Sequence, residues 1–191
     1  MPRTDSEKFY LASVKKYGIN AQGVHWISKE TQELRFDIIL DMLPKTMNTL
    51  VDAGCGFGDF YHYLQHKNIQ CKKYTGIDSL HKMCTIASKD TQQEIILADI
   101  TKDRLPLAEY YICSGAMNIL NTFETHLFIK NCLQSSQKAF IFNILHGPKQ
   151  SETYNYFSIK KIEKIAKELH VNKIEMRDDY MQNDITVGFF L

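Results

Sequence analysis

The stretch Thr49-Leu-Val-Asp-Ala-Gly-Cys-Gly-Phe-Gly58 joins a short apolar run to a turn that is rich in glycine. The apolar run predicts a strand, and the apolar residues behind the turn recur at the spacing of an amphipathic helix. Glycine lacks a Cβ atom, so a ligand can approach the bare backbone of such a turn closely. Turns of this kind hold nucleotide-like ligands beyond the carboxyl ends of parallel strands. The stretch therefore predicts a ligand site at the end of the strand.

Asp52 lies two positions before Gly54, the first glycine of the turn. A dinucleotide would bring a pyrophosphate to the N-terminus of the following helix, and the carboxylate of Asp52 would repel its negative charge. S-adenosylmethionine instead carries a sulfonium and an ammonium group, which a nearby carboxylate attracts. The acidic residue therefore favours S-adenosylmethionine as the ligand.

The composition is that of an ordinary globular protein. The chain has 191 residues, of which 44% are hydrophobic and 24% are charged, which suits one domain with a substantial core. The formal net charge is only +1, which argues against a protein that holds long nucleic acids by neutralising phosphates. We therefore expect a small-molecule partner, and the sequence does not indicate an oligomeric state.

The sequence shows no membrane, disulfide or metal pattern. No stretch approaches the roughly 20 apolar residues that cross a bilayer, and the N-terminus has no apolar signal core. The five cysteines are odd in number and scattered, which indicates reduced thiols. His62 and His66 are four residues apart but lack the H-E-x-x-H pattern and a third ligand. We therefore expect a cytoplasmic protein without a metal site.

Apolar patterning divides the single expected domain into an N-terminal helical cap, residues 1–48, and an alternating core, residues 49–191. In the cap, Ser28 is the expected N-cap of a helix that Pro44 terminates. In the core, strands alternate with helices, which predicts a mostly parallel α/β sheet covered on both faces. Two final strands around a short turn predict an antiparallel C-terminal hairpin. The seven expected strands cover residues 49–53, 71–77, 94–98, 110–114, 138–144, 173–176 and 185–190.

Four motifs resemble those of the class I S-adenosylmethionine-dependent methyltransferases. Residues 51–58 resemble the first motif of that family, and residues 75–79, Thr-Gly-Ile-Asp-Ser, resemble the motif on its second strand. Residues 98–100 and 112–116 resemble the ends of its third and fourth strands. Asp78 follows Gly58 by 20 residues and precedes Asp99 by 21, one strand–helix unit each. The resemblance covers residue 49 to the C-terminus and implies a doubly wound, Rossmann-like methyltransferase fold, with S-adenosylmethionine as cofactor and S-adenosylhomocysteine as product.

The resemblance also implies what each motif does. Asp52 and the glycine turn would face the methionine moiety, and Asp78 would accept hydrogen bonds from both ribose hydroxyls, since a carboxylate has two acceptor oxygens. Asp99 and the backbone N–H of Ile100 would bind the adenine. The alternatives are a helix cap for Asp78 and a surface turn for Asp99. The cofactor-binding residues expected from these motifs are Asp52, Gly54, Cys55, Gly56, Gly58, Asp78, Ser79, Asp99, Ile100, Ser114 and Gly115.

A second resemblance lies before the sheet. Residues 26–36 resemble a W-x-S-x-x-x-Q-x-x-R-F pattern of a subgroup of small bacterial methyltransferases, and residues 179–186 resemble the closing hairpin of the same subgroup. Gln32 and Arg35 lie about one helical turn apart, so they share a face. Arg35 could bind the cofactor carboxylate with two parallel hydrogen bonds, and a solvated helix face is the alternative. This pattern adds Trp26, Gln32 and Arg35 to the candidate cofactor site.

Polar and aromatic residues after the fourth and fifth strands are candidates for the acceptor side. The candidates for a catalytic role are Asn118, Asn143 and His146, and each could also be a plain loop or strand-end residue. The run 146–157 is too long for an ordinary connection, so we expect it to form a lid over the acceptor pocket. The alternative is that its aromatic residues pack beneath the loop. The expected lid residues are Tyr154, Tyr156 and Phe157.

The predicted reaction is direct transfer of a methyl group to a nucleophile on a small-molecule acceptor, for which the protein mainly aligns the two partners. The chain lacks the [DNS]-P-P-[YF] and Pro-Cys signatures, which argues against methylation of planar amino groups and of base C5. An NAD(P)-dependent oxidoreductase is the alternative, but its G-x-G-x-x-G/A fingerprint needs a small residue where Asp59 stands. A non-catalytic module that binds S-adenosylmethionine is the third hypothesis.

Overall fold

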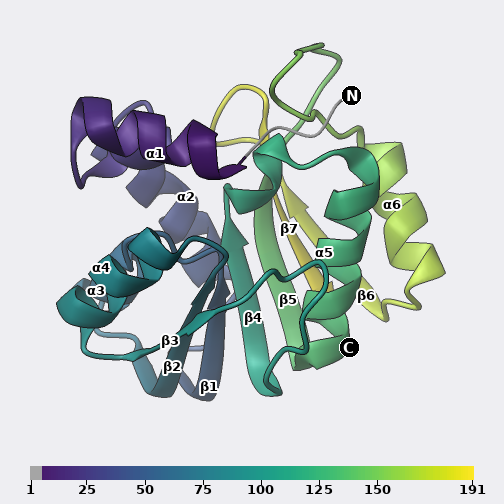
Figure 1. Ribbon diagram of the computed structural model, residues 1–191. Coiled ribbons are helices and arrows are strands. Elements are labelled where there is room, and N and C mark those ends of the chain that lie inside the picture. The colour runs from purple at the N-terminus through teal and green to yellow at the C-terminus, as the bar shows by residue number, and fades with distance from the viewer. Residues whose placement is uncertain (1–5) are drawn as a thin grey trace.

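The structure, a computed structural model, describes residues 6–191 of the chain. Seven strands form one sheet (Figure 1). They are β1 Thr46–Ala53, β2 Gln70–Asp78, β3 Glu94–Leu97, β4 Ala108–Ser114, β5 Ser136–Leu145, β6 Lys173–Arg177 and β7 Asp184–Phe190. Their order across the sheet is β3-β2-β1-β4-β5-β7-β6.

The pairing of the strands confirms the predicted α/β architecture. β1 pairs in parallel with β2 and β4, β2 with β3, and β4 with β5. β7 runs antiparallel between β5 and β6, so the C-terminal hairpin is part of the sheet. The order turns back at β1, which places the carboxyl ends of β1, β2 and β4 beside one another at the switch point where such sheets bind ligands.

Helices precede the first strand and connect several of the others. They are α1 Ser6–Tyr17, α2 Lys29–Asp41, α3 Asp59–His66, α4 His81–Thr91, α5 Thr122–Ser135 and α6 Ile159–Glu168, with short 3₁₀ helices η1 Ala21–Val24 and η2 Ala116–Ile119. Ser28 is the N-cap of α2 and forms a capping box with Thr31. The helix ends before Pro44 because the residue that precedes a proline is disfavoured in the helical region. β1 then starts at Thr46, three residues earlier than its apolar run predicts.

The central strands are buried on both faces of the sheet. Neighbouring residues of one strand belong to different hydrophobic clusters. Cys113 and Phe140 join a cluster that contains Phe128 of α5 and Ile162 of α6. Their neighbours Ile112 and Ile141 join a second cluster with Phe36 of α2 and Phe60 of α3. Side chains alternate between the two faces of a strand, so the continuous apolar runs of these strands reflect burial on both sides.

The N-terminal segment covers the carboxyl ends of the strands. Val14 of α1 packs with Phe57 of the glycine turn and Met83 of α4 in a third, smaller cluster. Figure 1 shows α1 above the ends of β1 and β4, at the edge of the sheet where the glycine turn lies. The first five residues of the predicted cap, 1–5, lie outside the described residues.

Candidate active site

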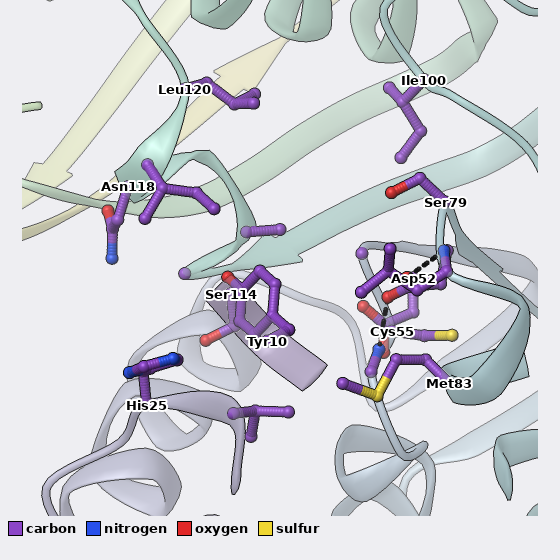
Figure 2. A pocket seen from close by; sticks show the side chains of 18 of the residues that line it. Tyr10, His25, Asp52, Cys55, Ser79, Met83, Ile100, Ser114, Asn118 and Leu120 are labelled. Atoms are coloured by element: carbon purple, nitrogen blue, oxygen red, sulfur yellow. Dashed lines mark hydrogen bonds between the residues drawn. The ribbon is translucent and has the colours of Figure 1, made fainter. Parts of the chain in front are cut away.

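A cavity of about 580 Å³ lies at the carboxyl ends of β1, β2 and β4, beneath α1 and η1. Figure 2 shows side chains from these separate segments converging on it. The predicted cofactor-binding residues line this cavity, except Gly58 and Arg35. The motifs therefore meet in one place although they are spread over residues 26–115 of the chain.

The glycine turn forms one wall of the cavity through Gly54 and Gly56. Both have positive φ angles, +83° and +54°, a region that residues with a side chain rarely adopt. The backbone N–H groups of Gly54 and Cys55 both donate to the carbonyl of Ile77, at 2.7 and 3.0 Å. A Cβ atom at Gly54 would lie 2.3 Å from the Cβ atom of Ala116. The turn therefore packs closely against both β2 and η2, and only glycine fits at position 54.

Gly58 has a structural role that differs from the predicted contact with the cofactor. It does not line the cavity, and it begins α3 with a φ of +90°. A Cβ atom there would lie 2.4 Å from the Cγ2 atom of Thr91 at the end of α4. The third glycine therefore lets two helices pack closely, which corrects the prediction made for it.

Asp52 is the penultimate residue of β1 and lines the cavity, with only 3% of its surface exposed. Its Oδ2 atom accepts a hydrogen bond from the Tyr74 hydroxyl of β2 at 2.7 Å. Burial raises the pKa of Asp52 to about 7, and the bond from Tyr74 opposes this rise. This carboxyl group is therefore poised to gain charge near neutral pH or when a cation arrives.

Asp78 ends β2 and lines the cavity beside the glycine turn. Its Oδ2 atom accepts from the Gly56 N–H at 3.0 Å, and its Oδ1 atom accepts from the Leu80 N–H at 2.9 Å. Burial raises the pKa of Asp78 to about 6, and these backbone bonds act in the opposite direction. Each oxygen keeps a lone pair for a further donor, so the cap-like bond to Leu80 and a ligand contact are compatible.

The loop after β3 contributes Asp99 and Ile100 to the cavity. The Oδ1 atom of Asp99 accepts from the Thr101 N–H and hydroxyl, and its Oδ2 atom accepts from Lys102. An adenine amine would therefore compete with these donors, while the buried side chain of Ile100 offers an apolar surface.

Ser114, Gly115 and Trp26 form the wall at the end of β4. Gly115 has a φ of +79°, and a Cβ atom there would lie 2.6 Å from the indole of Trp26. Gln32 of α2 also reaches the cavity, where its amide donates to Asp59 at 3.0 Å. Trp26 and Gln32 thus both line the cavity, even though the region before the sheet contributes no strand.

Arg35 does not stand where the pattern predicts. Its guanidinium donates to the Oδ2 atom of Asp184 on β7 through Nε at 2.8 Å and also through Nη2. Its Nη1 atom donates to the Thr31 carbonyl, and its guanidinium carbon lies 4.5 Å from the centre of the Trp26 ring. The side chains of Arg35 and Asp184 are only 8% and 1% exposed. The Arg35 guanidinium therefore packs against the Trp26 ring and does not line the cavity. This corrects the assignment of Arg35 to the cofactor carboxylate.

A chain of hydrogen bonds connects this ion pair to the cavity. Ser114 donates to the Asn143 Oδ1 atom at 2.7 Å, and the Asn143 amide donates to Thr186 at 2.7 Å. The Tyr180 hydroxyl joins Thr186 to Asp184, at 2.8 and 2.6 Å. Asn143 is buried and does not line the cavity, so it positions Ser114 and is not a contact for the acceptor.

His146 also lies outside the cavity lining. Its Nδ1 atom is 3.1 Å from the Phe157 carbonyl, and its Nε2 atom is 4.0 Å from a carboxylate oxygen of Asp178. His146 stands at the start of the loop after β5, and its contact with Phe157 joins the two ends of that loop. Of the three candidates for a catalytic role, Asn118 alone lines the cavity.

The three aromatic residues of the loop after β5 lie in different surroundings. Tyr154 lines the cavity, whereas Tyr156 lies beside Lys149, whose Nζ atom is 5.8 Å from its ring centre. Phe157 is fully buried in the core, and its N–H donates to the Leu145 carbonyl. Phe157 therefore anchors the loop as the alternative interpretation held, and the lid prediction is corrected for Phe157 and Tyr156.

Sequence reasoning missed the residues that α1 and η1 bring to the cavity, Phe9, Tyr10 and His25. No periodic pattern marks them, since their position depends on how α1 lies over the sheet. The one local signal is that His25 directly precedes Trp26 of the pattern before the sheet.

Residues 6–191 contain no cluster of three or more His, Cys, Asp or Glu side chains suited to a metal ion. His62 pairs with Asp90 at 2.7 Å on the surface, and all five cysteines are free thiols. None of the helices between residues 6 and 191 combines the length and apolar character that crossing a bilayer requires.

Residues 51–132 match the family model of a methyltransferase domain. This segment runs from the end of β1 to α5 and contains the glycine turn, Asp78, Asp99 and Ser114. No curated protein matches the sequence.

Solved structures show the same fold at low sequence identity. A S-adenosylmethionine-dependent methyltransferase from Clostridium acetobutylicum is 14% identical with a TM-score of 0.69, over 98% of this chain and 99% of that chain. A magnesium protoporphyrin IX methyltransferase from Synechocystis with bound SAH is 15% identical with a TM-score of 0.66, over 84% and 81%. A small RNA methyltransferase, HEN1, is 15% identical with a TM-score of 0.66, over 83% of this chain and 25% of that chain.

Proposed function

We propose that this protein transfers a methyl group from S-adenosylmethionine to a small-molecule acceptor, because residues 51–132 match the family model of a methyltransferase domain. The observation that carries the proposal is the meeting of Asp52, Asp78 and the glycine turn in one cavity at the carboxyl ends of β1 and β2. In this proposal residues 1–48 form a cap on a catalytic core of residues 49–191.

The residues present suit the cofactor. Asp78 keeps acceptor capacity for the ribose hydroxyls, and Asp52 places a carboxyl group below the turn for a cationic methionine moiety. Leu80 and Ile100 supply apolar walls on the same side for the adenine. When bound, S-adenosylmethionine supplies an electrophilic methyl group, and the protein contributes alignment and exclusion of water.

A small acceptor is supported by charge and by enclosure. The net charge of +1 offers little attraction for long nucleic acids. The cavity is roofed by Phe9 and Tyr10 from α1 and by Tyr154 from the loop after β5. These rings leave a chamber of the size that small ligands occupy.

Replacement of Asp78 by alanine is expected to weaken binding of S-adenosylmethionine and S-adenosylhomocysteine by about 1–3 kcal/mol, because the ribose diol loses its acceptors. Calorimetric titration measures the loss, with NAD and NADP as comparison ligands. Asp90→Ala, which removes an exposed carboxylate of α4, is the matched control and should bind normally. Equal affinity of the Asp78 variant, or binding of the nicotinamide cofactors alone, would sink the proposal. Tight cofactor binding without turnover of any acceptor would instead favour a non-catalytic module.

The affinity for S-adenosylmethionine is expected to rise with pH between about 6 and 7. The pKa of Asp78 is about 6 and that of Asp52 about 7 because both are buried, and their ionised forms attract the cationic ligand. The Tyr74 hydrogen bond lowers the pKa of Asp52, so Tyr74→Phe should move the rise to higher pH. Calorimetry across this range measures the shift, with Tyr61→Phe, on a neighbouring ring, as control. An affinity that does not change with pH would contradict the assignment of both carboxylates.

A further inference from the structure

Four rings form one end of the cavity, and we call them the aromatic cap: Phe9, Tyr10, His25 and Tyr154. Phe9 stacks on His25 with ring centres 3.9 Å apart and an interplanar angle of 16°. Tyr10 and Tyr154 approach Phe9 edge-on, at 5.3 and 6.3 Å. Three of these rings come from the N-terminal segment and one from the loop after β5, so two distant segments close over the same space. Flat apolar walls of this kind suit a planar ligand.

The hydrogen bond that His25 makes determines which of its ring nitrogens is basic. Its Nε2 atom lies 3.3 Å from the backbone carbonyl of Phe9. A carbonyl oxygen can only accept, so the Nε2 atom carries the proton and the Nδ1 atom of the neutral ring keeps a free lone pair. The stacked Phe9 ring holds the imidazole in its plane. The backbone of His25 is left-handed, with a φ of +65°, where it ends η1.

Asn118 supplies a donor on the other side of the same space. Its Oδ1 atom accepts from the Leu145 N–H at 3.1 Å, and this bond sets the orientation of the amide. Its backbone carbonyl accepts from the Asn155 N–H at 2.8 Å, which ties η2 to the loop after β5. Figure 2 shows the amide nitrogen of Asn118 and the imidazole of His25 directed into the same part of the cavity. An acceptor molecule therefore meets one donor and one proton acceptor between flat walls.

We propose that the methyl acceptor is a planar ring compound with an O–H or N–H nucleophile, and that the Nδ1 atom of His25 removes the proton from that nucleophile. This inference rests on the proposed methyl transfer. For an O–H nucleophile, Asn118 donates a hydrogen bond to one lone pair of the oxygen, and the second lone pair of that oxygen attacks the methyl carbon. The aromatic cap holds the ring of the acceptor.

The step balances in atoms and electrons. The oxygen or nitrogen of the acceptor forms a bond to the methyl carbon, the carbon–sulfur bond breaks, and its electron pair returns to sulfur. The proton of the nucleophile passes to the Nδ1 atom of His25 and is later released to water. Besides the aspartates and Cys55, the ionisable groups that line the cavity with His25 are Glu7 and Tyr10 of α1, Glu124 of α5 and Tyr154. Burial raises the pKa of both tyrosines, which keeps them protonated, so neither tyrosine competes with His25 as the base.

A binding experiment tests the substrate class. The full chain is saturated with S-adenosylhomocysteine and titrated with 2-naphthol, 2-naphthylamine and the saturated decahydro-2-naphthol, while the ring nitrogens of His25 are followed by ¹⁵N NMR. We expect both planar probes to bind at least tenfold more tightly than the saturated alcohol and to shift the His25 signals. We expect Tyr154→Ala to weaken the binding of both planar probes. We also expect the proton on Nε2. Equal affinity for the saturated probe, or a proton on Nδ1, would overturn the inference.

A kinetic experiment tests the base. With S-adenosylmethionine and 2-naphthol, His25→Phe keeps the stacked ring and is expected to lower kcat about 10²–10⁴-fold without changing cofactor affinity. His62→Phe changes an exposed histidine of α3 and should leave the rate unchanged. A rate within twofold of the wild type for His25→Phe, or bound 2-naphthol that is never methylated, would refute the role of His25. A wild-type protein that does not bind S-adenosylhomocysteine would instead refute the proposed function itself.

Discussion

Replacement of Arg35 by methionine is expected to lower the free energy of unfolding by about 3–5 kcal/mol, because it leaves a buried carboxylate without its partner. Arg35 and Asp184 join α2 to β7, and both side chains are nearly inaccessible to water. Urea denaturation measures the loss. Trp26 rests on the Arg35 guanidinium, so we also expect weaker binding of S-adenosylhomocysteine.

The loss should depend on pH in a defined direction. Burial raises the pKa of Asp184, and Arg35 opposes this effect. Without Arg35, the pKa of Asp184 in the folded protein rises further above its value in the unfolded chain. In the pH interval between these two pKa values, Asp184 is protonated in the folded protein but ionised in the unfolded chain. The free energy of unfolding of the Arg35→Met variant therefore falls as pH rises through that interval. The difference in stability between the variant and the wild type is then smaller at acidic pH.

Two further variants separate burial from the mere loss of an ion pair. Arg177→Met removes an exposed pair with Asp179, whose side chains are 43% and 65% exposed, and should cost less than about 1 kcal/mol. Arg35→Met combined with Asp184→Asn leaves no buried charge and keeps an acceptor for Tyr180, so it should recover most of the loss. If Arg35→Met costs no more than Arg177→Met, the buried pair does not hold α2 to the sheet.

Replacement of Gly54 by alanine is expected to cost about 2–5 kcal/mol of stability and to reduce cofactor affinity. A positive φ angle costs a residue with a Cβ atom about 1–2 kcal/mol, and overpacking adds about 1–3 kcal/mol. Both apply here, since φ is +83° and the new Cβ atom would lie 2.3 Å from that of Ala116. Denaturation and calorimetry with S-adenosylhomocysteine measure the two effects.

Gly18 provides the matched control for this variant. Its φ angle is +80°, but a Cβ atom there would meet nothing within 4 Å. Gly18→Ala should therefore show the backbone strain alone and leave cofactor binding unchanged. The double variant Gly54→Ala with Ala116→Gly should recover the overpacking part. Equal losses at Gly54 and Gly18 would show that the approach of η2 to the turn is not tight.

The part of the site that could be predicted lies at strand ends. Asp52 and Asp78 follow apolar strand patterns, and parallel strands bring their carboxyl ends to one edge. The glycine turn is contiguous in sequence, so its conformation follows from residue types alone. These local patterns were sufficient to predict the sheet and the part of the cavity lining that lies at the strand ends.

The residues that were misplaced depend on distant partners. Arg35 was assigned to the ligand, but its partner Asp184 lies 149 positions away, and no helical pattern reveals such a pairing. Gly58 faces the end of α4, and Phe157 enters the core below its loop. A sequence indicates that a side chain is polar, small or aromatic, whereas its neighbours follow from how the elements pack.

The order of apolar runs and turns determined the α/β fold, the glycine turn and the two acidic strand ends, because these features arise from period, backbone freedom and charge within short stretches. The tertiary structure alone decided what roofs the cavity. Phe9, Tyr10 and His25 reach it because α1 packs on the glycine turn and α4, and Tyr154 reaches it because the loop after β5 is tied to η2. Long-range packing between separate elements, which no local pattern encodes, therefore sets the acceptor side of this protein.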